Sequence, residues 1–238
     1  MTHLRAFSWG LAIILAVPAS SFSQDLSPGS APPFTLSKTS TIMPAVSKIP
    51  GADRVQLRKL SQALGATHSA KILVIGSSST VGVGASSPAR TYVARLETDL
   101  EAALEGTDFE VIGRGMSGEV AQGAADRMKR EVEEVKPDLL IWQVGTNDAL
   151  GHVALDNFKN CLKKTLAWLK LQHIDVVLIN PQYGDVLIKD AYYEEVVAAI
   201  ADIARESQVL LVDRFDAMRK LQRASGDRFF AFPPTTFT

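Results

Sequence analysis

Short apolar runs alternate with helical patterns from residue 71 onward, and this alternation most constrains the fold. The runs have the length and the β-branched content of strands, and they lie at 71–75, 109–112, 138–144, 174–180 and 208–212. Apolar residues at helical spacing follow them at 89–104, 119–135, 155–171, 190–206 and 214–223. Strands that are apolar throughout are typical of a parallel sheet covered on both faces. The sequence therefore predicts an α/β fold, a three-layer α/β/α sandwich with a parallel, flavodoxin-like five-stranded sheet.

Three of the predicted strands end in turns rich in glycine and polar residues. Gly-Ser-Ser-Ser-Thr-Val-Gly at 76–82 follows the first strand, a turn with Ser-Gly-Glu at 117–119 follows the second, and Gly-Thr-Asn-Asp at 145–148 follows the third. The carboxyl ends of parallel strands meet at one edge of the sheet, where α/β proteins bind ligands. Ser78, in the first turn, is therefore a candidate nucleophile, provided that a base takes its proton.

Taken in this order, the three turns resemble the motif blocks of the SGNH/GDSL hydrolases. The first block of that family is Gly-Asp-Ser-x-Thr-x-Gly, the second has a glycine in a Ser-Gly-Asp/Glu setting, and the third is Gly-x-Asn-Asp. The resemblance covers roughly residues 70–220 and departs from the first block at Ser77, where Asp is usual. It implies that Ser78 is the nucleophile and that the Gly118 N–H and the Asn147 side-chain amide, with the Ser78 N–H, stabilise an oxyanion. It implies no metal and no cofactor.

Each turn also has a simpler interpretation. The serine-rich turn can be a helix-capping loop or an anion cradle, although it lacks the Gly-Lys-Ser/Thr of a P-loop. Gly118 can be an ordinary turn glycine, and Asn147 and Asp148 can form a turn or a helix N-cap. A flavodoxin-like nucleotide or anion binder therefore stays open beside the hydrolase.

The resemblance also implies an Asp-x-x-His block after the last strand, which would supply the base, and this block is not found. The sequence has four histidines, at positions 3, 68, 152 and 173, and none has Asp three residues before it. After the last strand, Asp-Ala-Met-Arg at 216–219 ends in arginine, which stays protonated. Two histidines, His68 and His173, precede predicted strands and so belong to the opposite edge of the sheet. His152 follows the third turn and is the one histidine expected at the motif edge.

The N-terminus has the pattern of a secretory signal. Arg5 precedes an apolar run at 6–17 that is shorter than the roughly 20 residues needed to cross a bilayer, and small residues follow up to position 23. The alternative is an uncleaved anchor. We expect a signal peptide at 1–23, a Pro/Ser/Thr-rich linker at 24–52, and an SGNH hydrolase-type domain at 53–238 that is incomplete at its C-terminal end.

Composition excludes some classes of partner. The chain of 238 residues is 46% hydrophobic and 21% charged, with a net charge of −1, so no nucleic-acid partner is indicated. The single cysteine, Cys161, lies on an apolar helical face and is interpreted as a buried structural thiol. The sequence thus predicts a secreted or periplasmic serine esterase for a small-molecule, glycan or lipid ester, impaired by the missing histidine. The alternative is a non-catalytic ligand-binding module on the same fold.

Overall fold

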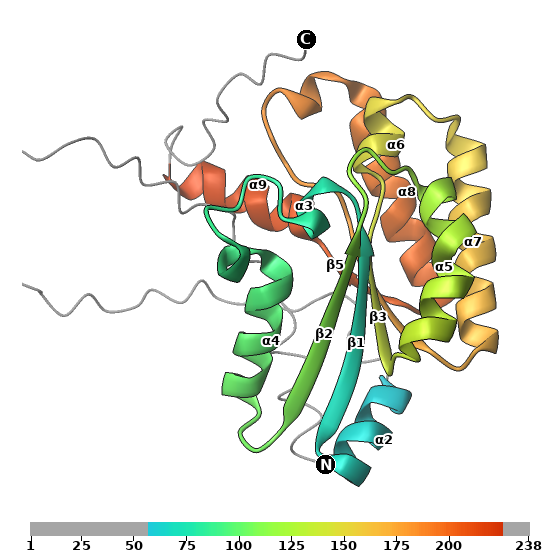
Figure 1. The fold of residues 1–238 in the computed structure, drawn as a ribbon. Coiled ribbons are helices and arrows are strands. Elements are labelled where there is room, and N and C mark those ends of the chain that lie inside the picture. The colour runs from blue at the N-terminus through green and yellow to red at the C-terminus, as the bar shows by residue number, and fades with distance from the viewer. Residues whose placement is uncertain (1–56, 226–238) are drawn as a thin grey trace, which may run out of the picture.

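The computed structural model describes residues 57–225 and contains one parallel five-stranded sheet (Figure 1). The order in the sheet is β2-β1-β3-β4-β5, so β1 lies between β2 and β3. The chain adds β2 on one side of β1 and then adds β3, β4 and β5 on the other side. This is the flavodoxin-like order that the sequence predicts. The strands are β1 Ser69–Gly76, β2 Asp108–Gly115, β3 Leu139–Gln143, β4 Asp175–Ile179 and β5 Leu210–Val212.

Helices connect consecutive strands, and short helices follow β1 and β3. The longer helices are α2 Arg58–Thr67, α4 Tyr92–Ala103, α5 Ala121–Val135, α7 Leu155–Leu171, α8 Ala191–Ser207 and α9 Arg214–Ser225. The short helices are α3 Ser78–Val81 and α6 Thr146–Leu150, and 3₁₀ turns occupy Pro88–Arg90 and Leu187–Lys189. Both short helices begin in the motif turns, so each presents its first residues at the carboxyl edge of the sheet.

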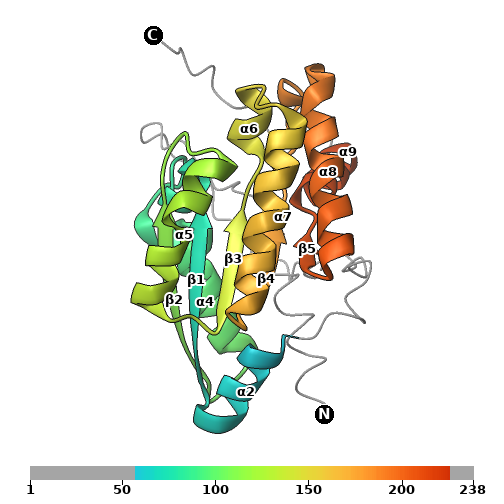
Figure 2. The same cartoon turned by 90° about the vertical axis from the view of Figure 1, so that its right-hand side faces the viewer.

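The sheet separates two apolar cores. On one face, Leu60 of α2 and Leu96 and Leu100 of α4 pack against alternate strand residues such as Ile72 and Val74. On the other face, α5, α7 and α8 lie side by side (Figure 2) and enclose Leu73 and Trp142. In β1, β3 and β4, most residues facing either side are buried, which explains why these strands are apolar almost throughout, whereas the edge strand β2 is partly exposed. The predicted three-layer α/β/α sandwich is therefore confirmed.

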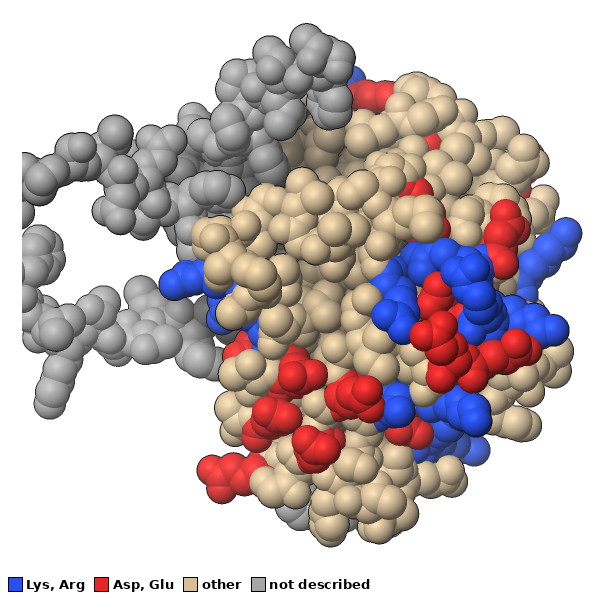
Figure 3. Space-filling view, in the orientation of Figure 1, with Lys and Arg blue, Asp and Glu red and all other residues tan. Residues whose placement is uncertain are grey.

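Some expectations for individual elements are wrong. The spacing of Leu57, Leu60 and Leu64 predicts a helix that ends at Gly65, but α2 continues to Thr67 and stops with His68 in a left-handed conformation. The short helices α3 and α6 were not predicted, because four or five residues show no helical period. The charged run at 130–136 predicts a solvated helix side, but Glu131 within it is buried and paired with Arg114, Arg127 and Arg130. Acidic and basic side chains interleave over α5 on the surface (Figure 3).

Other expectations lie outside the described residues. The signal peptide at 1–23, the linker at 24–52 and the segment after residue 225 belong to this group, so they stay predictions. Within residues 57–225, no helix combines the length and the apolar character that crossing a bilayer requires.

Helix α3 lies against β2 with almost no space between their backbones, because β2 ends in glycine. A Cβ at Gly115 would lie 2.5 Å from the Val81 nitrogen and 2.8 Å from the Thr80 carbonyl carbon. These are backbone atoms that cannot rotate away. Gly115 therefore allows α3, and with it Ser78, to approach the second strand.

We expect Gly115→Ala to lower the free energy of unfolding by about 1–3 kcal/mol, the usual cost of overpacking. The matched control is Gly65→Ala at an exposed position of α2, where a Cβ meets nothing within 4 Å. That change should be neutral or stabilising by up to about 1 kcal/mol, because alanine favours helix. Urea unfolding of both variants measures the difference. Equal stabilities would contradict the close approach of α3 and β2.

Candidate active site

The three motif turns converge at the carboxyl edge of the sheet. Strand β1 pairs in parallel with both β2 and β3, so the turns that follow all three strands are neighbours. The Met116 N–H donates to the Gly76 carbonyl at 2.9 Å and ties the second turn to the first. The convergence expected from the sequence therefore holds for the first, second and third turns.

Ser78 is the first residue of α3 and is half-buried. The first N–H groups of a helix have no acceptor within the helix, so the Ser78 N–H points out of the helix start. Ser77 before it is buried, and its N–H donates to Gln143 Oε1 at 3.3 Å. A Cβ at Gly76 would lie 2.2 Å from Thr80 Oγ1 and 2.9 Å from Gln143 Oε1. Gln143, at the end of β3, thus anchors the turn that carries Ser78.

Gly118 lies at the exposed tip of the second turn with φ of +77°. This left-handed conformation favours glycine, and nothing lies within 4 Å of a Cβ built there. The next residue, Glu119, donates its N–H to the Met116 carbonyl at 3.1 Å, which closes the turn. The backbone conformation, rather than crowding, therefore accounts for a glycine at this position.

Asn147 reaches from α6 to the second turn. Its Nδ2 donates to the Glu119 carbonyl at 2.8 Å. An asparagine amide carries two N–H donors, so this bond orients the amide and leaves one N–H for another acceptor. The side chain is half-buried, as a group that meets a ligand at the surface needs to be. Asn147 is thus placed beside the residue that follows Gly118.

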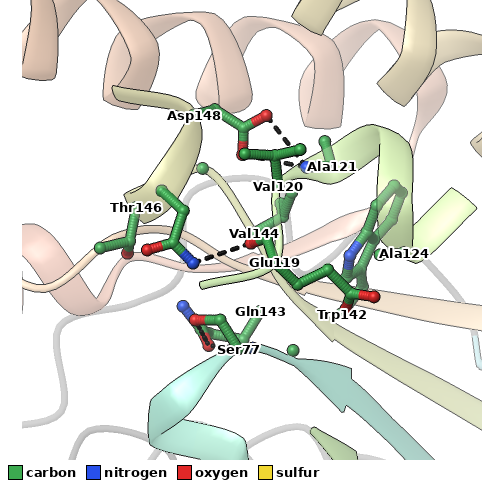
Figure 4. Close-up of a pocket in the computed structure, with 13 residues that line it drawn as sticks. Ser77, Glu119, Val120, Ala121, Ala124, Trp142, Gln143, Val144, Thr146 and Asp148 are labelled. Atoms are coloured by element: carbon green, nitrogen blue, oxygen red, sulfur yellow. Dashed lines mark hydrogen bonds between the residues drawn. The ribbon is translucent and has the colours of Figure 1, made fainter. Parts of the chain in front are cut away.

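Asp148 links α6 to the start of α5, just after the second turn, through a buried carboxylate. Its Oδ1 and Oδ2 accept from the Ala121 N–H at 2.9 and 3.1 Å, at the first residue of α5 (Figure 4). The side chain is almost completely buried. Burial raises the pKa of the Asp148 carboxyl above its ordinary value, and the N–H donors, that of Ala121 among them, oppose the shift.

Residues from all three turns line a small cavity of about 10 Å³. Ser77, Glu119 and Thr146 are among its lining residues, and Figure 4 shows them around it. Its volume is close to the least that holds one water molecule. The cavity therefore marks where the turns meet, and it is too small to enclose an ester substrate.

A half-buried arginine lies next to the third turn. Arg214, the first residue of α9, donates to Gln182 Oε1 at 2.6 Å, and Thr146 Oγ1 donates to the same oxygen at 3.2 Å. Burial lowers the pKa of Arg214, and it raises the pKa of the neighbouring Tyr193 to about 12. Gln182 thus links Thr146, the first residue of α6, to Arg214 at the start of α9.

The histidines occupy the places that the sequence predicts. His68 precedes β1 and His173 precedes β4, so both lie at the amino edge of the sheet. His152 follows α6, and its Nε2 lies 2.8 Å from Asp190 Oδ2, with its ring stacked on Tyr192 at 5.1 Å. Its side chain is exposed. His152 is thus held by a carboxylate at the rim of the motif edge, and His3 lies outside the described residues.

Sequence reasoning missed several residues of this site. Gln143, which anchors the first turn, lies in a run interpreted as strand core. The pairing of Glu119 with Arg127, described below, was also not predicted. A signal for it existed in Gly123, an otherwise unexplained glycine inside a helical pattern. Among residues 57–225, no group of three or more His, Cys, Asp or Glu side chains is arranged to hold a metal ion.

Three turns of this kind at the carboxyl edge of a parallel sheet define an SGNH/GDSL-type hydrolase domain. The model of the non-GDSL lipase-like family matches residues 45–233, and the chain belongs to this family. Esterase TesA of Pseudomonas aeruginosa is 28% identical over 148 residues, which are 60% of this chain and 70% of TesA.

Solved structures show the same fold. The crystal structure of TesA superposes with a TM-score of 0.55 at 25% identity and covers 61% of this chain and 78% of that one. AlinE4, an SGNH-hydrolase family esterase, superposes with a TM-score of 0.54 at 24% identity, and the match covers 67% of this chain and 80% of AlinE4. A variant of Axe2, an acetyl xylan esterase from Geobacillus stearothermophilus, superposes with a TM-score of 0.53 at 22% identity. The match covers 65% of this chain and 80% of the Axe2 chain.

We expect Asp148→Asn to become more stable relative to the parent chain as pH rises. Because the folded pKa of Asp148 is raised, the parent loses stability as pH rises from the ordinary Asp value through the folded value. Asparagine does not titrate and keeps an acceptor for the Ala121 N–H. Asp148→Ala removes that acceptor and should cost about 1–3 kcal/mol.

Urea unfolding at a series of pH values, from the ordinary pKa of Asp up to neutrality, measures this dependence. The control is Asp202→Asn, which removes an exposed pairing with Arg205 and should change little. Parallel pH profiles for the parent and Asp148→Asn would contradict the raised pKa.

Proposed function

We propose that the chain is an exported SGNH-type serine hydrolase that acts on carboxylic ester bonds, with lipid acyl or carbohydrate O-acetyl groups as substrates. The observation that carries this proposal is the hydrogen bond from Asn147 Nδ2 to the Glu119 carbonyl, at 2.8 Å. It brings an amide donor from the third turn to the turn of Gly118, beside the start of α3. TesA and the structural neighbours are named as esterases, which supports ester hydrolysis as the reaction.

In the proposed reaction, Ser78 Oγ attacks the ester carbonyl carbon and the carbonyl oxygen becomes an oxyanion. The Ser78 and Gly118 N–H groups and the second N–H of Asn147 donate to that oxyanion. Loss of one such donor typically costs about 3 kcal/mol of transition-state stabilisation. The oxyanion collapses and breaks the ester C–O bond, and the alcohol leaves with the proton that Ser78 Oγ gave up. Water then hydrolyses the acyl-enzyme to the carboxylic acid and the free Ser78 hydroxyl.

The sequence has no Asp-x-x-His segment after β5 that would supply the base for Ser78. After β5, Asp216 forms ion pairs with Arg219 and Lys220, so the Asp-x-x-Arg segment at 216–219 is a cluster of paired charges and no acid–base pair. We therefore propose that the 238-residue chain turns over esters poorly. The alternative function, a non-catalytic ligand-binding module, is favoured by the same observation.

Export is the part of the proposal that rests on the sequence alone. We expect cleavage between Ala19 and Gln24, because small residues there follow the apolar run. N-terminal sequencing of exported material checks this, and a mature protein that begins at Met1 would contradict it.

We expect Ser78→Ala to abolish both residual esterase activity and labelling by a fluorophosphonate. Ser79→Ala is the matched control, because Ser79 lies on the same short helix and is also half-buried. It should keep most of the activity and the label. Mass spectrometry of the labelled chain locates the modified residue. Equal losses in the two variants would contradict the assignment of Ser78, and an unlabelled but ligand-binding chain would favour the binding module.

We expect hydrolysis of short p-nitrophenyl esters to be barely above background and to rise by several orders of magnitude when a family-like segment with Asp-x-x-His is appended. The control is the same segment with alanine in place of its histidine. Robust turnover by the unextended chain would contradict the missing-base proposal. His152→Ala would then show whether the histidine paired with Asp190 serves as the base.

A further inference from the structure

A buried ion pair lies directly behind the second turn. Arg127 of α5 donates through Nε to Glu119 Oε1 and through a terminal nitrogen to Glu119 Oε2, both at 2.7 Å. The exposed fractions of the two side chains are 9% for Arg127 and 4% for Glu119. Two parallel bonds of this kind fix both the position and the orientation of the carboxylate.

The same guanidinium also contacts the strand that leads into the turn. It donates to the Arg114 carbonyl at 2.8 Å, one residue before the end of β2, and lies 3.5 Å from Glu131. Arg127 therefore joins the end of β2, the turn residue Glu119 and its own helix. The turn between Gly115 and Ala121 is held at both ends by a single side chain.

A glycine in α5 leaves space for the Glu119 side chain of this pair, although glycine lowers helix stability. Gly123 lies inside α5, where glycine costs about 1 kcal/mol relative to alanine. A Cβ there would lie 3.2 Å from Glu119 Cγ, so alanine would crowd the carboxylate arm. The glycine is thus explained by the Glu119 side chain that packs over it.

The pair reaches the proposed oxyanion donors through Glu119. The carbonyl of Glu119 accepts from Asn147 Nδ2, and Gly118 is the preceding residue. Arg127, Glu119 and Asn147 thus form a continuous series of hydrogen bonds from α5 to α6. A change in the guanidinium is expected to move the acceptor that orients Asn147.

Stability alone is a weak reason to bury two charges. Removing ions from water costs several kcal/mol each, and well-packed apolar residues are often as stable. The direct contact of Glu119 with Asn147 supplies a more specific reason. We propose that the Glu119–Arg127 ion pair positions the Asn147 amide and the Gly118 N–H for the oxyanion. This inference rests on the proposed function, and both residues are positioning residues that do not touch the substrate.

Arg127→Lys tests the proposal, because lysine keeps the charge and loses the two-pronged contact. In ¹⁵N–¹H NMR of the 238-residue chain, the Nδ2 hydrogens of Asn147 should exchange with water about tenfold faster, the effect of one lost hydrogen bond. The Asn147→Asp variant identifies the signal by its absence. The rate of Ser78 labelling by a fluorophosphonate should also fall about tenfold, the change for one weakened donor contact.

The matched control is Arg130→Lys. Arg130 lies on the same helix, but its side chain is exposed and pairs with Glu131 at 3.0 Å rather than with Glu119. This variant should leave the exchange rate and the labelling rate unchanged. Urea unfolding confirms that each variant is folded, and Glu119→Gln, which keeps the shape of the side chain, replaces Arg127→Lys if that variant does not fold.

The outcomes separate the two hypotheses. Faster exchange at Asn147 in Arg127→Lys or Glu119→Gln, with Arg130→Lys unchanged, supports the positioning role. Unchanged exchange in a folded variant overturns it, whatever the labelling shows. If Ser78 of the parent chain is not labelled at all, the proposed function fails, and the exchange rates still decide whether the ion pair positions Asn147.

Discussion

The parallel pairing of β1 with both β2 and β3 is the constraint on which the rest of the structure depends. It places three sequence-distant turns next to one another, because the carboxyl ends of parallel neighbours lie at one edge. The apolar character of β1 is a consequence, since a central strand is covered on both faces. The glycines that end β1 and β2 are a second consequence of this pairing. A Cβ at Gly76 would meet Thr80 and Gln143, and a Cβ at Gly115 would meet the backbone of α3.

The second turn is held from two directions by charged groups. Asp148 accepts the first N–H of α5, and Arg127 binds Glu119 from behind. Between these contacts lie Gly118, with its left-handed backbone, and the Glu119 carbonyl that orients Asn147. Polar groups that are buried and fully bonded make such a turn rigid, and a rigid turn presents fixed donors to a developing charge.

Membership of the non-GDSL lipase-like family agrees with the departure at Ser77, where the related family has Asp. Ser77 still fills a defined place, with its N–H bonded to Gln143 at the end of β3. This contact uses the backbone N–H, so it does not depend on the side chain at position 77. In the described residues after β5, Asp216 is paired with Arg219 and Lys220.

Sequence alone determined the class of the fold, because the period of apolar residues reports directly which faces are buried. It also located the three motif turns, since glycine and small polar residues interrupt that period. It did not determine the short helices α3 and α6, which are too short to show a period, or the end of α2 beyond Gly65. Only the tertiary structure decided the partners of Glu119, Asn147 and Asp148. Hydrogen bonds between residues distant in the chain depend on three-dimensional placement, and no spacing along the sequence encodes them.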